Sequence, residues 1–537
     1  MKILFYLEIH PIRNSYSSFT WVGKQIINML RKQYLSQHHA KIDYDDIRIV
    51  VSRHYQELID NNQDLKTIFL GLTKEENDRL SFYMRDWNSD VQAINNWTSL
   101  MQGTGEVSEF YKSILDRIYQ NTFSFDVVVN WSTNGAIRDF CRERGLSNVS
   151  MELGCVREPI INTVCFDACG VNGNSVIKNL DFNAIDEDEL IDIKTIMPIK
   201  TKHDMSLDSL FRPINCSASD VLYSSFGKNV LIPLQLKDDS NRIIFSRFHG
   251  MYDFLSEIIP QLLDAGYTCI VKPHPMANAS AAREVNKKDH FQCQEYVDKL
   301  GLDSVIWLDD LKGNENYLSL LNLVNYVVSI NSSMAFEAMM LGIPTVVMGN
   351  APFDIGSYSF EDLLEDKYPE ELALKNKIIT NVIYRNYLVP QSLAFEYEHF
   401  IFHIRRAIRL NKILMNKGAS AFTKEIIKHD NISYIYESLN TEPLVKKRHL
   451  EHYNKHVEQI KKKSTSTTTL AASISNVTPE LIMSTVTPSP SAGELVIKHP
   501  VIKSSFKKKM IKLKNNPKKF FKDSKKGYIR VLSNIIP

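Results

Sequence analysis

Short apolar runs that end in polar residues recur along the chain and predict a parallel α/β fold. The runs at 267–271 and 326–330 have the length and the bounding turn residues typical of buried strands. The second run leads into a helical stretch at 334–341, which Gly342 closes, and a further strand is predicted at 343–348. Open parallel sheets bind ligands at the carboxyl ends of their strands, so the polar residues that follow these runs are candidate site residues.

The same alternation of strand and helix patterns extends over most of the chain. Further strands are predicted at 1–9, 47–51, 126–130, 149–153 and 230–234, and further helices at 136–144, 252–265 and 394–415. Such alternation favours parallel sheets covered by helices. We therefore expect an α/β protein with two Rossmann-like domains that face a cleft. The expected parts are the domains 1–228 and 229–395, a helical extension at 396–463, a flexible linker at 464–500 and a basic tail at 501–537.

Length and composition narrow the class of protein. The chain has 537 residues and is 44% hydrophobic, so it is long enough for two or three domains with large cores. The apolar run at its start is too short for a signal peptide, and no window approaches the roughly 18 apolar residues of a membrane span. Seven cysteines without two closely spaced pairs make a zinc site improbable and indicate reduced thiols, which we interpret as a cytoplasmic setting.

The net charge of +2 conceals a strongly basic tail. Residues 501–537 hold twelve Lys or Arg and one Asp, which gives a net charge of +11 and leaves −9 for the remainder. Lysines alternate there with apolar residues such as Phe520 and Phe521, as in segments that bind anionic membrane surfaces. We expect a peripheral protein at the inner face of the cell membrane. Nucleic acid fits the charge of the tail equally well, but the body has no basic stripe in a recognisable nucleic-acid fold, so we expect no nucleic-acid partner.

The residues after the two strands at 267–271 and 326–330 have the chemistry of a phosphate site. Ser332 and Ser333 stand at a predicted helix start, where hydroxyls and backbone N–H groups bind anions. His274, between two prolines, is a rigid hydrogen-bond donor. Each residue also has a structural explanation, because serine is a common helix cap and a single His is more often a packing residue. Their combination in one strand–helix–strand unit favours a nucleotide-phosphate site.

Two α/β domains with a nucleotide site in the second are typical of GT-B glycosyltransferases. In that architecture the cleft holds the reaction, with the donor on the C-terminal domain and the acceptor on the N-terminal domain. We expect no metal and no cofactor, because helix N-termini and side chains neutralise the leaving phosphate. The acidic pairs Asp238-Asp239 and Asp309-Asp310 are interpreted as surface charge or turn residues.

Several segments resemble the bacterial capsule polysaccharide synthesis family, the β-Kdo transferases that build the Kdo linker of capsules. They lie in the family's order between about 125 and 360. The matching residues are Glu152-Leu153-Gly154 with Arg157; Asp167 with Gly170-Val171-Asn172-Gly173; Pro233-Leu234-Gln235 with Asp238-Asp239-Ser240; Lys272-Pro273-His274-Pro275; Asn331-Ser332-Ser333 with Glu337; and Gly349-Asn350-Ala351.

The resemblance implies a nucleotide-sugar donor, namely a CMP-activated acidic sugar with Kdo as the default, and a glycan or glycolipid acceptor. Asp167 matches the position taken to be the nucleophile, and we expect it to face the cleft opposite His274. Glu152 matches an acid/base position. An Asx turn is the structural alternative for Asp167. The resemblance implies donor binding by Lys272, His274, Asn331, Ser332, Ser333 and Glu337, with Ser332 and Ser333 on the phosphate and Glu337 on the ribose, and places Arg157, Asn172 and Gln235 in the same site.

Two other functions remain open at this point. A CDP-polyol phosphotransferase of the teichoic-acid type also uses a Lys-Pro-His-Pro motif and a Ser pair at a helix start. A non-catalytic glycan-assembly protein that retains the fold belongs to a different class. The presence of both Asp167 and His274 favours an enzyme over this second alternative.

Overall fold

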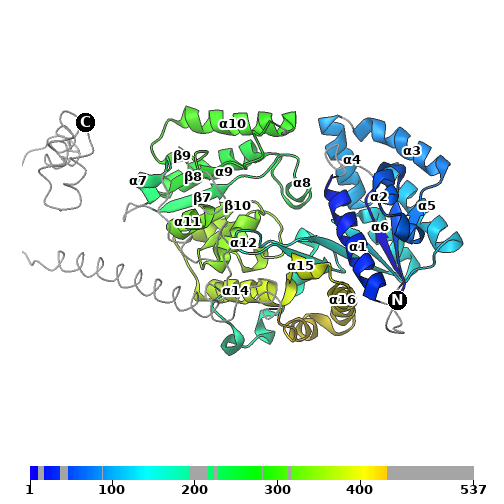
Figure 1. Ribbon diagram of the computed structural model, residues 1–537. Coiled ribbons are helices and arrows are strands. Elements are labelled where there is room, and N and C mark those ends of the chain that lie inside the picture. Colours follow the sequence, from blue (N-terminus) through cyan, green and yellow to red (C-terminus); the bar gives the residue numbers. More distant parts are fainter. Residues whose placement is uncertain are drawn as a thin grey trace, which may run out of the picture. The chain divides into compact units, whose positions relative to one another are not determined.

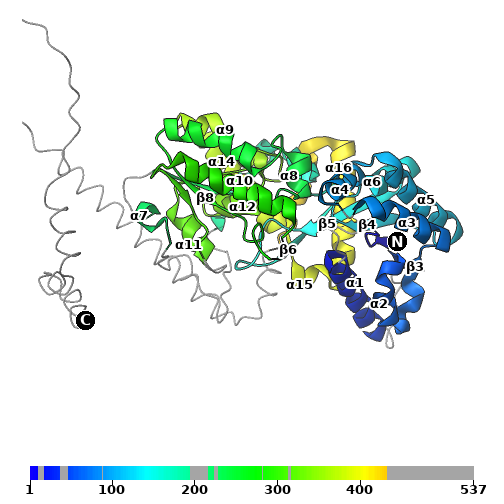
Figure 2. The same ribbon diagram turned by 90° about the horizontal axis from the view of Figure 1, so that it is seen from above.

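The computed structural model describes residues 1–9, 17–36, 46–87, 89–193, 216–222, 228–280, 282–311 and 316–431 (Figure 1). The predicted linker, the basic tail and the part of the helical extension beyond 431 lie outside the described residues. The described part contains two α/β halves, each built on its own sheet (Figures 1 and 2). The α/β fold class with two Rossmann-like sheets is therefore confirmed. No helix among the described residues is both long and apolar enough to cross a membrane.

The first sheet has the strand order β12-β6-β5-β4-β1-β2-β3. Its five strands from β3 to β5 are parallel, but β6 pairs antiparallel with β5, and β12 antiparallel with β6. The expectation of a purely parallel first domain was wrong in this respect. The strands are β1 (Ile3–Tyr6), β2 (Ile47–Val51), β3 (Phe69–Gly71), β4 (Val127–Trp131), β5 (Ser147–Leu153), β6 (Thr163–Asp167) and β12 (Val389–Pro390).

The second sheet is wholly parallel, with the order β11-β10-β7-β8-β9. In chain order this is 3-2-1-4-5, the same order that β3, β2, β1, β4 and β5 take in the first sheet. The order reverses between β7 and β10, and ligands of such sheets bind at this switch point. The strands are β7 (Asn229–Pro233), β8 (Thr268–Lys272), β9 (Val305–Trp307), β10 (Tyr326–Ser329) and β11 (Thr345–Val347).

Both faces of the second sheet are covered, which explains why its strands are continuous apolar runs. Successive side chains of a strand point to opposite faces. Val230 and Ile232 pack in one core with Phe254 of α9, whereas Leu231 packs in another core with Leu318 of α11 and Phe336 of α12. Figure 2 shows α9 on one side of β8 and α11 on the other.

The helices predicted after the apolar strands are all present within a few residues of their expected bounds. The one predicted at 394–415 corresponds to the part of α16 before Gly418, where the backbone is non-helical with a φ of 80°, and a second helical segment follows to Ile426. The α-helices are α1 (Ser17–Ser36), α2 (Gln56–Asp60), α3 (Lys74–Met84), α4 (Asp90–Gln102), α5 (Gly105–Asn121), α6 (Gly135–Arg144), α7 (Ser219–Leu222), α8 (Ser240–Phe245), α9 (Met251–Asp264), α10 (Glu284–Leu300), α11 (Asn316–Leu323), α12 (Ser333–Met340), α13 (Phe360–Leu364), α14 (Glu370–Asn381), α15 (Gln391–Ala394) and α16 (Tyr397–Ile426).

After the second sheet the chain returns to the first. Strand β12 adds to its edge, and α16 then packs along both halves. Phe400 and Ile404 of α16 lie in the core of the first half, whereas Leu410 and Phe422 lie in a core shared with the second half. This helix therefore belongs to both halves and fixes one against the other.

An ion pair also joins the two halves. Arg283, which precedes α10, donates from Nε to Oδ1 of Asp90 on α4 at 2.8 Å and from Nη2 to the Asp90 carbonyl at 3.1 Å. Its Nε also lies 3.7 Å from Oδ2 of Asp238, a side chain that is 0% exposed. Figures 1 and 2 show α4 and α10 side by side. Arg283 thus offsets the charge of a buried carboxylate while it connects the halves.

Replacing this arginine should destabilise the protein. We expect Arg283→Ala to lower the free energy of unfolding by about 2–4 kcal/mol, because it removes a cation beside the buried Asp238 carboxylate together with both contacts to Asp90. Urea denaturation measures the change. The control is Lys299→Ala, which breaks an exposed pair with Glu295 on the same helix and should cost less than about 0.5 kcal/mol. Equal effects of the two variants would show that the Arg283 contacts contribute nothing measurable.

Candidate active site

A cavity opens between the two halves at the switch point of the second sheet. Its volume is about 830 Å³ including the open mouth. We call it the cleft cavity. It is lined by Leu153, Gly154, Cys155, Arg157, Cys165, Asn172, Gln235, Asp239, Asn241, His274, Asn331, Ser332, Ser333, Asn350, Ala351, Pro352, Phe353, Tyr387 and Leu388. Seven of the eleven residues predicted for the site lie on this surface, namely Arg157, Asn172, Gln235, His274, Asn331, Ser332 and Ser333.

Gln235 and Asn331 bridge the two central strands of the second sheet. The Gln235 Nε2 donates to Asn331 Oδ1 at 2.8 Å, and the Asn331 backbone N–H donates to Gln235 Oε1 at 3.2 Å. The Asn331 side-chain amide also donates to the carbonyls of Asn241 and Asn350, at 3.2 and 3.3 Å. These contacts engage both ends of the Asn331 amide. The structure therefore shows Asn331 as a residue that fixes the cavity wall.

Ser332 and Ser333 begin α12 at the cavity surface. Ser332 is the N-cap, and its hydroxyl accepts a hydrogen bond from the Met334 N–H at 3.3 Å. The capping function considered as the alternative is thus present. Ser332 still lines the cavity, and the first N–H groups of α12 and its positive dipole end lie at the same place. A helix start of this kind favours an anion.

His274 is held in one orientation by its own turn. Its Nδ1 accepts a hydrogen bond from the Met276 N–H at 3.1 Å, and its carbonyl accepts from the Ala277 N–H at 2.9 Å. Because Nδ1 is the acceptor, the neutral ring carries its proton on Nε2. The prolines on either side restrict the backbone further. His274 therefore offers a fixed donor in the cavity that holds Ser332 and Ser333.

The first half contributes Arg157 and Asn172. Arg157 is exposed, and its Nε donates weakly to the Gly154 carbonyl at 3.4 Å. Asn172 has a φ of 57°, in the left-handed region that asparagine tolerates better than most residues. This conformation turns the loop after β6 toward the cavity. Both residues were singled out only by the family resemblance.

Lys272 and Glu337 do not line the cavity. Lys272 ends β8, and burial lowers the pKa of its amine. Glu337 is 4% exposed on α12, where it contacts the Tyr317 hydroxyl and the Arg157 backbone N–H. Burial raises the pKa of Glu337 to about 8, and those two contacts and the Arg157 charge act in the opposite direction.

Asp167 is also buried, and the expectation that it faces the cleft was wrong. Its side chain is 1% exposed and does not line the cavity. Its Oδ1 accepts from the Cys169 N–H at 2.8 Å, which is the Asx turn considered as the alternative. Its Oδ2 accepts from the hydroxyls of Ser175 and Tyr387, both at 2.8 Å, and from the Val176 N–H at 2.9 Å. Burial raises the pKa of Asp167, and these donors oppose the rise.

Glu152 lies near the cavity without lining it. It is partly buried on β5, and its Oε1 accepts from the Leu153 N–H at 2.9 Å. Burial raises its pKa, while that N–H, the Arg157 charge and the Ser132 hydroxyl lower it. Ser132 has a φ of 67°, which is rare outside glycine and concentrates near functional sites. A carboxyl with a raised pKa beside an arginine suits general acid/base chemistry.

Sequence reasoning missed several residues of the cavity. Asp239 lines it and also caps α8, with its side chain accepting from the Asn241 N–H at 2.9 Å. The turn chemistry predicted for it is therefore present. Its neighbour Asp238 is 5% exposed, so surface charge was a wrong interpretation for that residue. Tyr387 and Leu388 come from beyond the last motif and gave no sequence signal.

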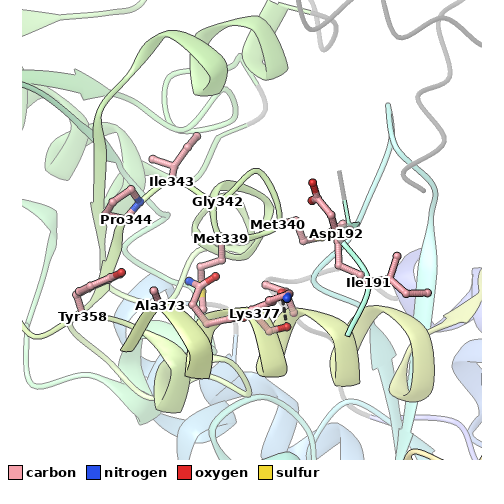
Figure 3. A pocket seen from close by; sticks show the side chains of 13 residues that line it. Ile191, Asp192, Met339, Met340, Gly342, Ile343, Pro344, Tyr358, Ala373 and Lys377 are labelled. Atoms are coloured by element: carbon pink, nitrogen blue, oxygen red, sulfur yellow. Dashed lines mark hydrogen bonds between the residues drawn. The ribbon is translucent and has the colours of Figure 1, made fainter. Parts of the chain in front are cut away.

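A second cavity lies at the opposite, C-terminal end of α12 (Figure 3). Its volume is about 930 Å³ including the open mouth, and its walls include Met339, Met340 and Ile343 with Asp192 and Lys377. None of the predicted site residues lines it. Among the described residues, no group of three or more His, Cys, Asp or Glu side chains is placed to hold a metal ion.

Comparison with known families agrees with the motifs. Residues 211–389 match the model of the capsule polysaccharide biosynthesis protein family, and residues 73–176 match that of the glycosyltransferase 99 family N-terminal domain. The two matches follow each other along the chain, one from α3 to beyond β6 in the first half and one over the whole second sheet. The resemblance to capsule polysaccharide synthesis proteins is thereby confirmed. A search of curated proteins found no match.

Several solved structures are similar to parts of the chain. The β-Kdo 2,4 transferase of Thermosulfurimonas dismutans KpsC is 17% identical, with a TM-score of 0.32, and the match covers 50% of this chain and 81% of that one. The β-Kdo 2,7 transferase of the same KpsC is 13% identical, with a TM-score of 0.30, over 66% and 98%. A UDP-GlcNAc 2-epimerase from Neisseria meningitidis is 12% identical, with a TM-score of 0.26, over 78% and 100%.

The buried Glu337 carboxyl should make stability depend on pH. The folded chain keeps this proton up to about pH 8, whereas an ordinary glutamate releases it near 4.5. The unfolded chain therefore binds fewer protons in this window, and the contribution of Glu337 to stability falls as pH rises through it. As the pH rises from about 5 to 8, the free energy of unfolding of Glu337→Gln should fall less than that of the wild type. We expect the two decreases to differ by at least about 1 kcal/mol.

Chemical denaturation at several pH values measures this difference. The exposed Glu361, also on the second half, supplies the control, because Glu361→Gln should follow the wild-type pH dependence. A Glu337→Gln curve parallel to that of the wild type would show that Glu337 is ionised in the folded chain well below pH 8.

Proposed function

We propose that this chain transfers an acidic sugar, Kdo or a related ketose, from a CMP-activated donor to a lipid-linked or growing capsule or surface polysaccharide. The observation that carries the proposal is the convergence of His274, Ser332 and Ser333 on one cavity at a sheet switch point. The family matches supply the class of reaction, because they describe capsule polysaccharide biosynthesis and a glycosyltransferase domain.

The phosphate of the donor belongs at the start of α12. The helix dipole, the serine hydroxyls and the fixed Nε2–H of His274 all favour negative charge at this point. Negative charge on the phosphate grows as the bond to the sugar breaks, so these groups stabilise the transition state more than the ground state. The chemistry of these donors supports departure of CMP without a metal.

The carboxylate of an acidic sugar has a partner in Arg157. Arg157 is exposed and lines the cleft cavity from the side of the first half. Arginine offers a planar pair of N–H donors that matches a carboxylate. A neutral hexose offers no carboxylate to this cation, and this favours an acidic donor sugar.

Two carboxyl groups have the expected catalytic chemistry. In a retaining transfer, Asp167 would attack the anomeric carbon as the bond to phosphate breaks and CMP leaves, and the acceptor hydroxyl would then displace it. Glu152 would take the proton of that hydroxyl. The described conformation does not bring Asp167 into contact with the cavity, since Tyr387 lies between. Direct attack by Asp167 therefore requires a rearrangement on donor binding that exposes its Oδ1 while Oδ2 keeps its hydrogen bond to Tyr387.

A donor screen tests the proposal. We expect turnover with CMP-Kdo or another CMP-activated acidic sugar, and none with CDP-glycerol or UDP-sugars, as judged by mass spectrometry of the products. His274→Ala should lower kcat/KM by about 10²–10³-fold, the cost of one such donor to a developing negative charge. His249→Ala is the control, because His249 is an exposed histidine of the same half that does not line the cavity.

Each arm of the screen has an outcome that contradicts the proposal. Turnover of CDP-glycerol alone would identify a polyol phosphotransferase, and binding without turnover of any donor would indicate an assembly protein. Activity of His274→Ala at the level of His249→Ala would remove His274 from the donor site. Rates should be unchanged by a chelator of divalent metals, and complete loss of activity would refute metal-independent transfer.

The basic tail is proposed to hold the enzyme at the inner face of the cell membrane, where a lipid-linked acceptor is found. The full-length chain should bind vesicles that contain anionic lipid, and binding should weaken as salt rises. The chain that ends at Lys463 should not bind them. Replacing Lys507, Lys508 and Lys509 by Gln should give intermediate binding. Equal sedimentation of the full-length and truncated chains with vesicles would place the membrane contact in residues 1–463.

A further inference from the structure

A buried hydrogen-bond cluster lies directly behind the wall of the cleft cavity. Its centre is the Asp167 Oδ2, which accepts from the hydroxyls of Ser175 and Tyr387. These two hydroxyls are 3.1 Å apart. Tyr387 is 5% exposed and lines the cavity, whereas Asp167 does not. Tyr387 is therefore the member of this cluster through which Asp167 is connected to the donor site.

An unusual helix turn places Tyr387 there. Helix α14 continues into a π-helix over Val382–Tyr387, closed by a hydrogen bond from the Leu388 N–H to the Ile383 carbonyl at 2.9 Å. Such wide turns are rare and occur frequently at functional sites. The chain then enters β12, which pairs antiparallel with β6, the strand that ends at Asp167. The return of the chain to the first half thus brings Tyr387 to Asp167 from 220 residues away.

We propose that Tyr387 is a positioning residue that holds the carboxylate of Asp167 in the orientation and charge state that its catalytic role requires. This inference rests on the proposed function, because it takes Asp167 to act in the transfer. A nucleophilic carboxylate must be ionised and must present one oxygen in a fixed direction. Four donors surround Asp167, and the Tyr387 hydroxyl is the one that comes from the cavity wall.

Burial and the neighbouring charge keep Tyr387 a donor. Burial raises its pKa well above the ordinary value, and the charge of Asp167 raises it further. The hydroxyl therefore stays protonated and donates to the carboxylate. A hydrogen bond to the charged form favours that form. The other titratable groups that interact with Asp167 among the described residues are the thiols of Cys165 and Cys169, whose pKa values burial raises to about 12, so both stay neutral.

A purely structural Tyr387 would behave differently. The residue packs in the core shared by the two halves, so its ring also contributes to stability. Tyr387→Phe keeps that ring and removes only the hydroxyl. Tyr384→Phe is the matched control, because Tyr384 lies one turn earlier on the same π-helix, is 0% exposed and does not line the cavity. Loss of a structural hydroxyl alone would leave the pH dependence of catalysis unchanged.

The test measures initial rates of the full-length variants over about pH 5–9, with the donor that the wild-type chain turns over, together with CMP binding by calorimetry. Tyr387→Phe should lower kcat about ten- to hundred-fold, the effect of one hydrogen bond to a charged group. Its KM and CMP affinity should stay within about twofold of wild type, since the phosphate donors are elsewhere. The acid limb of its kcat/KM profile should move to higher pH, because Asp167 becomes harder to ionise. Tyr384→Phe should match the wild type.

Ser175→Ala provides a second variant on the same oxygen. It should move the acid limb in the same direction, and it decides the question if Tyr387→Phe does not fold. Profiles and kcat values equal to those of Tyr384→Phe would overturn the proposal. So would a loss of CMP affinity as large as the loss of kcat, which would make Tyr387 a donor contact instead. Turnover of a polyol donor by the wild type would refute the proposed sugar transfer, while the same comparison of variants with that donor would still decide the function of Tyr387.

Discussion

The wall of the cleft cavity depends on the hydrogen bonds of one asparagine. Asn331 stands where the strand order of the second sheet reverses, and parallel strands on either side of such a point leave a crevice between their connections. Its amide and backbone connect Gln235 after β7, Asn241 of α8 and Asn350 after β11. Three segments that approach from different directions are thus held to one another by four hydrogen bonds. Ser332 and Ser333 follow Asn331 directly in the chain, so the hydrogen bonds of Asn331 also fix the positions of these two serines.

Most carboxyl groups near the site are buried, whereas most of its hydrogen-bond donors lie on the cavity surface. Glu337 and Asp167 are buried beneath or behind the cavity, and Glu152 is partly buried beside it. Among the described lining residues, Asp239 is the carboxylate, and its side chain is engaged as the cap of α8. The groups that face a ligand are mostly donors, namely Arg157, His274 and the start of α12. An anionic ligand binds more favourably to such a cavity, because carboxylates on the cavity surface would repel it.

The sequence pattern predicted the second sheet more completely than the site. Runs such as Val230–Ile232 are buried on both faces, and their apolar continuity is a local property. Likewise Ser332 and His274 follow their strands directly, so their meeting at one edge follows from the topology of parallel strands. Strand β12 and the π-helix before it depend on contacts with β6, more than 200 residues earlier, and no periodicity within 382–390 carries that information. The prediction that Asp167 faces the cleft was wrong for a related reason, because the Asp167 side chain is held by a hydrogen bond from the distant residue Tyr387.

The first half also has a side-chain bridge at the point where its strand order reverses, but the bridging groups differ from those of the second half. Glu8 after β1 and Asn134 before α6 bridge the two central strands, with Asn134 Nδ2 donating to Glu8 Oε2 at 3.0 Å. The second oxygen of Glu8 accepts from the Tyr111 hydroxyl and from the Ile9 N–H, and the side chain is 3% exposed. The buried Glu8 carboxylate accepts the hydrogen bonds of these donors, so none of them is left to bind an anion there. In the second half the bridge is a neutral amide pair, which leaves the adjacent helix start open. The two topologically equivalent crevices thus differ in their bridging groups, and the one in the second half fits the donor phosphate of the proposed function.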